Sequence, residues 1–190
     1  MGCNPHIIQC KKGVITIKRT RIGWQIFGFV FTAAVGTLLH FLYDWTGKNL
    51  LAAPLSAVNE SVWEHMKLLY VPLLIFAMIQ GRFLTRNYPA FWCGKLISTV
   101  VGLVTIPLLY YGYTGALGVS ADWFNITIFY IAAAVTFLLD THLLKHGLFC
   151  RHPKWALAVL LSIGGLFVAL TFWPPLLPLF RDPLTGTYGI

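Results

Sequence analysis

Apolar stretches of about twenty residues alternate along the chain with short polar connections. Crossing about 30 Å of hydrocarbon as a helix takes about 20 residues, and five stretches reach that length. They run from Trp24 to Tyr43, Val62 to Gly81, Gly94 to Tyr113, Trp123 to Thr141 and Trp155 to Trp173. Pro72 and Pro107 fall inside two of them, where a membrane helix tolerates proline as a kink. The pattern predicts an all-α fold, a polytopic membrane bundle of five transmembrane helices.

The composition agrees with this fold. Of the 190 residues, 57% are hydrophobic and 11% are charged, whereas a soluble domain carries about 25% charged residues. This excludes a secreted disulfide scaffold, a Rossmann enzyme and a nucleic-acid reader. We therefore expect membrane lipid as a partner, and no nucleic acid.

The basic residues predict the orientation of the bundle. Five Lys and Arg precede the first stretch, three join the second to the third, and three join the fourth to the fifth, which makes eleven of the fourteen. The positive-inside rule then places the N-terminus in the cytoplasm and the C-terminus outside, in a multi-pass protein of the cell membrane. Residues 1–22 are expected to form a basic cytoplasmic arm that orients the protein and contacts anionic lipid.

The same topology divides the rest of the chain. Residues 23–173 form the predicted five-span domain, and residues 174–190 form a Pro/Gly-rich tail packed on the outer face. All four cysteines, Cys3, Cys10, Cys93 and Cys150, fall on the cytoplasmic side, where thiols stay reduced. We therefore expect no structural disulfide.

Candidate chemistry gathers where the first stretch ends and the second begins, in HFLYDW (40–45) and SAVNESVWEHMK (56–67). These segments contain three i,i+4 pairs: His40 with Asp44, Glu60 with Glu64, and Ser61 with His65. Residues four apart share one face of a helix, and a short loop returns both segments to the same rim of the bundle. Two imidazoles and up to three carboxylates are therefore expected within reach of one another.

Three ordinary explanations compete for these residues. Asn59 or Ser56 could cap the second helix, with Glu60 near its positive end. Glu64 and Lys67 could form a salt bridge at the rim. The histidines could each hydrogen-bond a neighbouring helix. Taken together, however, the imidazoles and acids exceed what capping requires, and ionisable groups at membrane depth indicate a functional site.

Histidine and carboxylate side chains suit a divalent metal ion, with Zn²⁺ as the preferred ion. In this interpretation His40, Asp44 and His65 are metal ligands, and Glu64 and Glu60 supply the catalytic base. Asn59 and Arg181 would contact the substrate. The leading hypothesis is a metal-dependent hydrolase of lipid or lipid-linked substrates.

Two other functions remain open. Kinked helices and paired acids would also suit a small proton- or cation-coupled transporter or channel subunit, in which a buried Glu carries protons. The chain could instead be a non-catalytic membrane partner, with Gly102, Gly112, Gly164 and Gly165 at close helix contacts. A homodimer is compatible with each function.

A second polar cluster lies at the opposite surface in this topology. It contains Asp140, His142, His146 and His152 and includes a His-x-x-x-His spacing. A solvated helix end accounts for it. A single site that combines both clusters is excluded, because a full bilayer separates them.

Two resemblances follow from these motifs. The block SAVNESVWEHMKLLYVP and the ending PLFRDPLTGTYGI resemble an uncharacterised bacterial family of small multi-pass membrane proteins, which implies the architecture alone.

More distantly, NESVWEH (59–65) is similar to the signature that opens the second span of progestin and adipoQ receptors, members of a superfamily with alkaline ceramidases. That resemblance implies zinc bound by His65 with His142 and His146. The chain departs from the pattern by having five spans instead of seven, by Glu64 in place of a Thr, and by placing the motifs on opposite faces.

Overall fold

The computed structural model describes the chain from residue 5 to residue 190, and its side chains from residue 21 onward. Five long helices follow one another: α1 (Pro5–Trp45), α2 (Val62–Leu84), α3 (Phe91–Leu117), α4 (Asp122–His146) and α5 (Pro153–Phe172), then the short 3-10 helix η1 (Pro178–Phe180). All five long helices contain a stretch long and apolar enough to cross a membrane. The predicted five-helix membrane fold is confirmed. Cys3, Cys10 and the basic residues from Lys11 to Arg19 lie outside the described side chains.

The helix ends follow local sequence signals. Ser61, not Asn59 or Ser56, caps α2, and its hydroxyl accepts the backbone N–H of Glu64 at 3.4 Å. Gly118 ends α3 with a φ of 69°, in the left-handed region that favours glycine. Pro72 and Pro107 both lie inside unbroken helices, α2 and α3, as expected for prolines within membrane spans.

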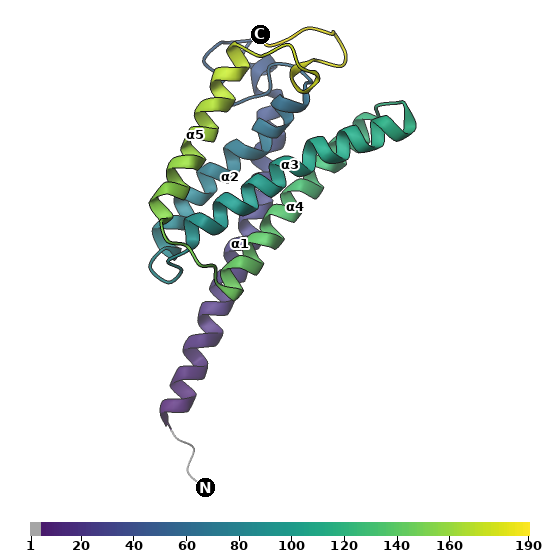
Figure 1. Cartoon of the computed structure of the whole chain (residues 1–190). Helices are drawn as coiled ribbons and strands as arrows, with labels where there is room; N and C mark the ends of the chain where they lie inside the picture. The colour runs from purple at the N-terminus through teal and green to yellow at the C-terminus, as the bar shows by residue number, and fades with distance from the viewer. Residues whose placement is uncertain (1–4) are drawn as a thin grey trace.

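Helix α2 is the centre of the bundle. It contacts the other four long helices and η1, and 67% of its most apolar window is buried, against 22–39% for the other helices. Figure 1 shows α5 on one side of α2, with the beginning of α1 and the C-terminus of the chain at opposite ends of the molecule. The connection between α3 and α4 projects away from the rest of the bundle, at the end that carries the C-terminus.

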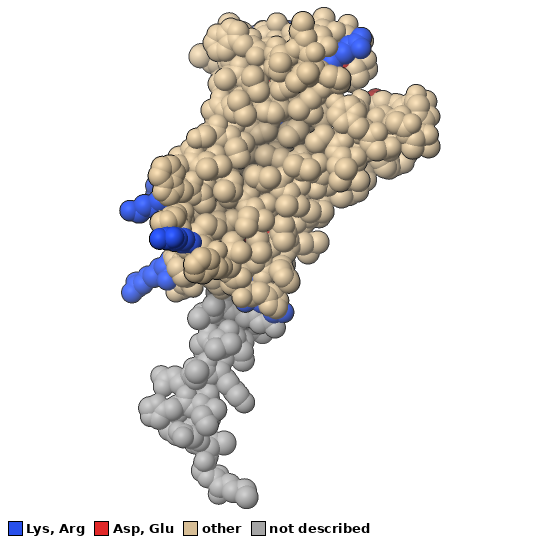
Figure 2. Space-filling model, in the orientation of Figure 1, with Lys and Arg blue, Asp and Glu red and all other residues tan. Residues whose placement is uncertain are grey.

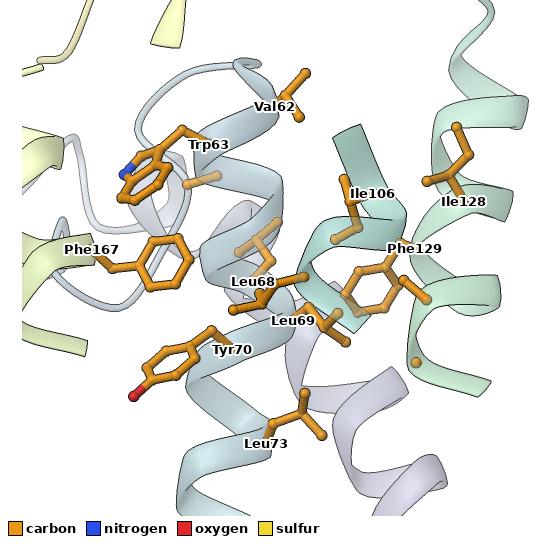
Figure 3. Close-up of a cluster of buried hydrophobic side chains, with 14 of the residues drawn as sticks. Val62, Trp63, Leu68, Leu69, Tyr70, Leu73, Ile106, Ile128, Phe129 and Phe167 are labelled. Atoms are coloured by element: carbon orange, nitrogen blue, oxygen red, sulfur yellow. The ribbon is translucent and has the colours of Figure 1, made fainter. Parts of the chain in front are cut away.

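The core is packed mainly through aromatic and branched side chains of α2. Trp63 and Tyr70 lie against Phe167 of α5, with ring centroids 4.4 and 5.1 Å apart, while Leu68 and Leu69 face the other side (Figure 3). Lipid tails are as apolar as these side chains, so close packing holds such helices together instead of water exclusion. Glycines permit this packing where helices cross: a Cβ at Gly102 of α3 would collide with Thr136 of α4.

The outer surface of the bundle is a wide apolar band. On the face drawn in Figure 2, Lys and Arg side chains gather at the two ends and leave the region between them uncharged. Large apolar side chains within the membrane-spanning helices, such as Leu108 of α3 and Leu138 of α4, are 69% and 70% exposed. A surface of this kind is stable in contact with hydrocarbon, which supports a multi-pass membrane protein.

The tail (residues 174–190) packs on the end of the bundle where α2 begins. Phe180 of η1 is buried, and its ring centroid lies 4.8 Å from that of Trp63. Near the C-terminus, Arg181 and Tyr188 form an antiparallel bridge, and the Gly189 carbonyl accepts the side-chain amide of Asn59 at 2.9 Å. The tail is therefore fixed to the loop between α1 and α2.

The expectation of no disulfide is wrong. Cys93, in the first turn of α3, is bonded to Cys150, in the connection between α4 and α5, with Cα atoms 6.2 Å apart. The expectation rested on the redox state of the predicted compartment. It took no account of the contact that brings these two segments together at disulfide distance.

Two lysine–carboxylate pairs are buried inside the bundle. In α2, the Lys67 ammonium lies 2.6 Å from a Glu64 carboxylate oxygen, and both side chains are almost fully buried. At the other end, Lys95 of α3 lies 2.7 Å from Asp140 of α4, which also accepts the amide of Gln25 at 2.6 Å. Because Asp140 is fully buried, it does not belong to the solvated helix end that the sequence suggested.

The Lys95 ammonium also lies over aromatic rings. Its Nζ is 5.3 to 5.8 Å from the ring centroids of Phe76, Phe91 and Phe137, within the range of cation–π attraction. This aromatic surround lowers the cost of holding an ammonium ion between helices.

Candidate metal centre

His40, Glu60 and His65 meet at the end of the bundle covered by the tail. His40 lies near the C-terminal end of α1, Glu60 lies in the loop two residues before α2 begins, and His65 lies in the first turn of α2. One Glu60 oxygen is 3.5 Å from Nε2 of His65, and the other is 3.8 Å from Nε2 of His40. The three ligand atoms lie within 4.8 Å of one another. We refer to these three residues as the triad.

The His65 ring is oriented by its own helix. Its Nδ1 lies 2.9 Å from the carbonyl oxygen of Ser61, one turn earlier. A carbonyl only accepts hydrogen bonds, so Nδ1 carries a proton, and Nε2 is the ring nitrogen that lies toward Glu60. Fixing a metal-binding imidazole through its second nitrogen is the usual outer-shell arrangement at metal sites.

The triad is compatible with a divalent ion if its side chains draw together. Metal–ligand bonds of about 2.1 Å in tetrahedral geometry place ligand atoms about 3.4 Å apart. The His65 and His40 nitrogens lie 3.5 and 3.8 Å from different Glu60 oxygens, and the three ligand atoms lie within 4.8 Å of one another. Binding one ion would therefore draw the three side chains closer together. All three side chains are partly buried, with 24–41% of their surface exposed, which leaves one side of the cluster open.

The open side faces a pocket of about 430 Å³. Its walls come from four parts of the chain: the triad, the facing turns of α3 and α4, and the tail residues Pro183 and Leu184. Figure 2 shows a notch in this region, between the end of the bundle and the projecting connection of α3 and α4. A three-ligand site beside an accessible pocket is typical of catalytic metal centres, which keep a fourth position for water or substrate.

The opposite wall carries polar residues that the sequence analysis did not select. Ser120, Asp122 and Asn125 line the pocket at the start of α4. Tyr113 holds this wall together, because its hydroxyl donates to Asn125 Oδ1 at 2.5 Å and lies 3.2 Å from Ser120 Oγ. The signal in the sequence was Asn125, three residues after Asp122, at the start of an apolar span. Polar side chains in a membrane span are costly unless they face a cavity or the interior of the bundle.

The remaining predicted ligand and base do not join the triad. Asp44 is exposed and is not part of the triad. Glu64 is 2% exposed and fully engaged: it pairs with Lys67, accepts the N–H of Val58 at 3.2 Å and accepts the Thr171 hydroxyl at 2.8 Å. The salt bridge between Glu64 and Lys67 that competed with the functional interpretation is therefore present, inside the bundle instead of at its rim.

The two predicted substrate contacts also have other surroundings. Asn59 accepts the N–H of Ser61 at 3.0 Å and donates to Gly189, which engages both ends of its amide. Arg181 is exposed in the tail next to the residues that line the pocket, but it is not among those lining it.

The zinc site implied by the second resemblance is not assembled. His142 and His146 stack with ring centroids 4.4 Å apart, but they lie at the C-terminal end of α4, whereas Asp122 at its beginning lines the pocket. A helix of this length spans about 36 Å. His65 therefore cannot share an ion with these two histidines.

Comparison with known proteins places the chain in a family. A family model, described as a family of unknown function (DUF6512), matches residues 15–190. The chain belongs to DUF6512. The match covers all five helices' membrane-spanning segments, the triad and the tail, so the site lies wholly within the family region. No curated protein and no solved structure matches the chain, and the similarity to progestin and adipoQ receptors is not shown.

Proposed function

We propose that this DUF6512 protein is a membrane hydrolase that depends on a divalent metal ion, Zn²⁺ by preference, held by His40, Glu60 and His65. The observation that carries the proposal is the convergence of two imidazole nitrogens and one carboxylate within 4.8 Å beside an open pocket. Two nitrogens and one oxygen form a ligand set that catalytic zinc sites use.

The proposal assigns Glu60 a different role from the one the sequence favoured. Its two oxygens are turned toward the two imidazoles, so we assign it as a ligand and not as the base. Glu64 is paired with Lys67, so we assign it a structural role and not that of the base. Asp122, a carboxylate that lines the same pocket without belonging to the triad, is the better candidate for moving protons.

The chemistry follows from this arrangement. The ion would lower the pKa of a bound water toward 7 and polarise the substrate carbonyl. The water oxygen forms a bond to the carbonyl carbon of an ester or amide, and the bond from that carbon to the leaving group breaks. Asp122 would take the proton from the water and return it to the leaving oxygen or nitrogen, which balances the reaction.

The surroundings of the pocket favour an amphipathic substrate. Val62, Ile106, Ile128 and Phe129 form its apolar surface, and Ser120, Asp122 and Asn125 form its polar side. The site lies at one end of helices that are apolar enough to cross a membrane. A lipid or lipid-linked molecule presents both kinds of surface at this depth.

The alternative of a proton-coupled transporter has less support. It depends on acids that are free to bind and release protons along a path between the two ends. Glu64 and Asp140, the buried acids on such a path, are each held by a lysine at 2.6 and 2.7 Å. Their pairing favours a structural role for both.

The test is the metal content of the purified protein. After incubation with zinc and removal of free metal, we expect about one zinc ion per chain, as a single three-ligand site would hold. His65→Ala should lose it. His142→Ala, which removes an exposed histidine from the distant pair, is the matched control and should retain it. Equal zinc retention by both variants, or no zinc in the unaltered protein, would overturn the proposal.

A further inference from the structure

A second hollow lies on the other side of the two histidines. It has a volume of about 150 Å³ and runs between α1 and α4, lined chiefly by Gly36, Thr37, Phe41, Leu68, Phe129 and Tyr130. It also includes His40, His65, Asn125 and Ile126, and these four residues and Phe129 line the larger pocket as well. The two hollows therefore meet at the imidazole rings. We refer to the smaller one as the crevice.

The crevice is almost entirely apolar and faces the side of the bundle. Phe41, Ile126 and Tyr130 at its edges are 45%, 59% and 38% exposed, on parts of α1 and α4 that lie within the candidate membrane spans. Only one direct polar contact crosses it, between the hydroxyls of Thr37 and Tyr130 at 3.2 Å. A hydrocarbon chain could reach the triad through this opening without leaving the lipid phase.

The size of the crevice limits its occupant. An engineered cavity of about 150 Å³ lined by Leu, Ile and Phe stays dry and binds benzene. The crevice therefore matches roughly six carbon atoms, which is a segment of one hydrocarbon chain and not of two. The larger pocket has polar groups along one wall, so it is unsuited to a second chain.

We propose that the crevice holds the first carbons of a single hydrocarbon chain, so that the substrate is a single-chain amphiphile whose scissile carbonyl lies at the triad. This inference rests on the proposed hydrolytic metal centre and adds the substrate class and its position. The polar part of the molecule occupies the pocket, beside Ser120, Asp122 and Asn125. The chain beyond its first carbons extends between α1 and α4 into lipid.

The experiment measures the binding of alkyl hydroxamates, which ligate zinc through their polar group. Acetohydroxamate has only a methyl group, whereas dodecanohydroxamate carries a long chain. Both are titrated by calorimetry into the zinc-loaded, full-length protein in lipid nanodiscs. We expect Thr37→Trp to fill the crevice and weaken dodecanohydroxamate about tenfold, because a few methylenes lose their close packing beside the triad, without affecting acetohydroxamate.

The matched control is Thr127→Trp. Thr127 is an exposed threonine of α4 whose hydroxyl donates to the carbonyl four residues earlier, as that of Thr37 does in α1, but it lines neither hollow. It should leave the binding of both compounds unchanged. If Thr37→Trp does not fold, Phe41→Trp, at an exposed position that lines the crevice but not the pocket, replaces it and should give the same selective loss.

The outcomes separate the two proposals. If acetohydroxamate binds but the crevice variants do not weaken the long-chain compound selectively, the crevice does not hold the chain and this inference is wrong, while the metal centre stands. If neither hydroxamate binds, or if both still bind to His65→Ala, the metal centre itself is wrong.

Discussion

Two acids four residues apart show how differently this bundle treats charge. Glu64 is almost fully buried and is engaged by the Lys67 ammonium at 2.6 Å, the Thr171 hydroxyl and the Val58 N–H. Glu60 is 41% exposed, and one imidazole nitrogen of His65 and one of His40 lie 3.5 and 3.8 Å from its oxygens. Glu64 is held by one ammonium group and two hydrogen-bond donors. The imidazoles near Glu60 are farther from its oxygens, at 3.5 and 3.8 Å. A carboxylate of the second kind is available to an ion.

The Lys95–Asp140 pair at the other end of the bundle is buried, as the Glu64–Lys67 pair is. Asp140 accepts hydrogen bonds from both Lys95 and Gln25 through one oxygen, deep between α1, α3 and α4. Breaking such a pair leaves an uncompensated charge in an apolar interior, which costs far more than breaking an exposed pair. The comparison therefore predicts large stability effects at the lysine pairs, and effects on metal binding at the triad.

The largest effect is expected at Lys67. Lys67→Met removes the ammonium and leaves the Glu64 carboxylate buried, which should destabilise the protein by about 3 to 5 kcal/mol. It also removes the hydrogen bond to the Ala53 carbonyl, 2.8 Å from Lys67 Nζ. Thermal unfolding in detergent, followed by size-exclusion chromatography of the heated samples, measures the change.

Two further variants test the cause of that loss. Lys48→Met removes an exposed lysine from the loop between α1 and α2 and should have little effect. The double variant Glu64→Leu with Lys67→Met should recover part of the stability, because no unpaired charge is left. If the double variant is no more stable than Lys67→Met alone, the unpaired carboxylate is not the reason for the loss.

A smaller effect on stability is expected from the metal itself. A ligand that binds only the folded state stabilises it by about 2.7 kcal/mol at a free concentration one hundred times its dissociation constant. Zinc should therefore raise the unfolding temperature of the unaltered protein. Glu60→Gln should leave the unfolding temperature without metal nearly unchanged, because exposed pairs contribute about 1 kcal/mol or less, but should remove most of the zinc response. A Glu64→Gln variant that loses the zinc response without losing stability would reverse the roles assigned to the two acids.

The zinc response should depend on pH in one direction. Zinc binds imidazoles that have lost their proton, so the metal-bound form carries fewer protons than the metal-free form, and stabilisation by zinc falls as the pH falls. Unperturbed imidazoles take up a proton near pH 6.5. The increase in unfolding temperature caused by zinc should be large at pH 8 and small at pH 5.5. An increase of the same size at both values would exclude histidine ligands.

The sequence predicted the fold well because the signal is local. Each span is a largely apolar run with polar or aromatic residues at or next to its ends. The approach of His40, Glu60 and His65 was predictable for the same reason, since one loop joins the two helices that carry them. The burial of Glu64 was not, because the Thr171 hydroxyl that donates a hydrogen bond to it lies 107 positions away.

The other features that the sequence did not reveal depend on contacts between distant segments. Asp122 and Asn125 reach the pocket only because the start of α4 lies opposite the end of α1. The Cys93–Cys150 bond joins residues 57 positions apart. Periodicity and hydropathy describe each helix separately, and these features arise from the way in which the helices pack.

The smallest expected effect concerns the tail, which lines one side of the pocket. Asn59→Ala removes the hydrogen bond to the Gly189 carbonyl and should cost about 1 kcal/mol, the usual net contribution of one such bond. The tail also carries Pro183 and Leu184, which line the pocket. Release of the tail should appear as faster digestion by carboxypeptidase, with only a slight change in unfolding temperature. Asn49→Ala is the control: Asn49 Oδ1 accepts the N–H of Leu51 in the same loop, a local bond that leaves the tail untouched. Equal digestion rates for the two variants would mean that Asn59 serves α2 through Ser61 alone, and that other contacts, such as Phe180 against Trp63, hold the tail in place.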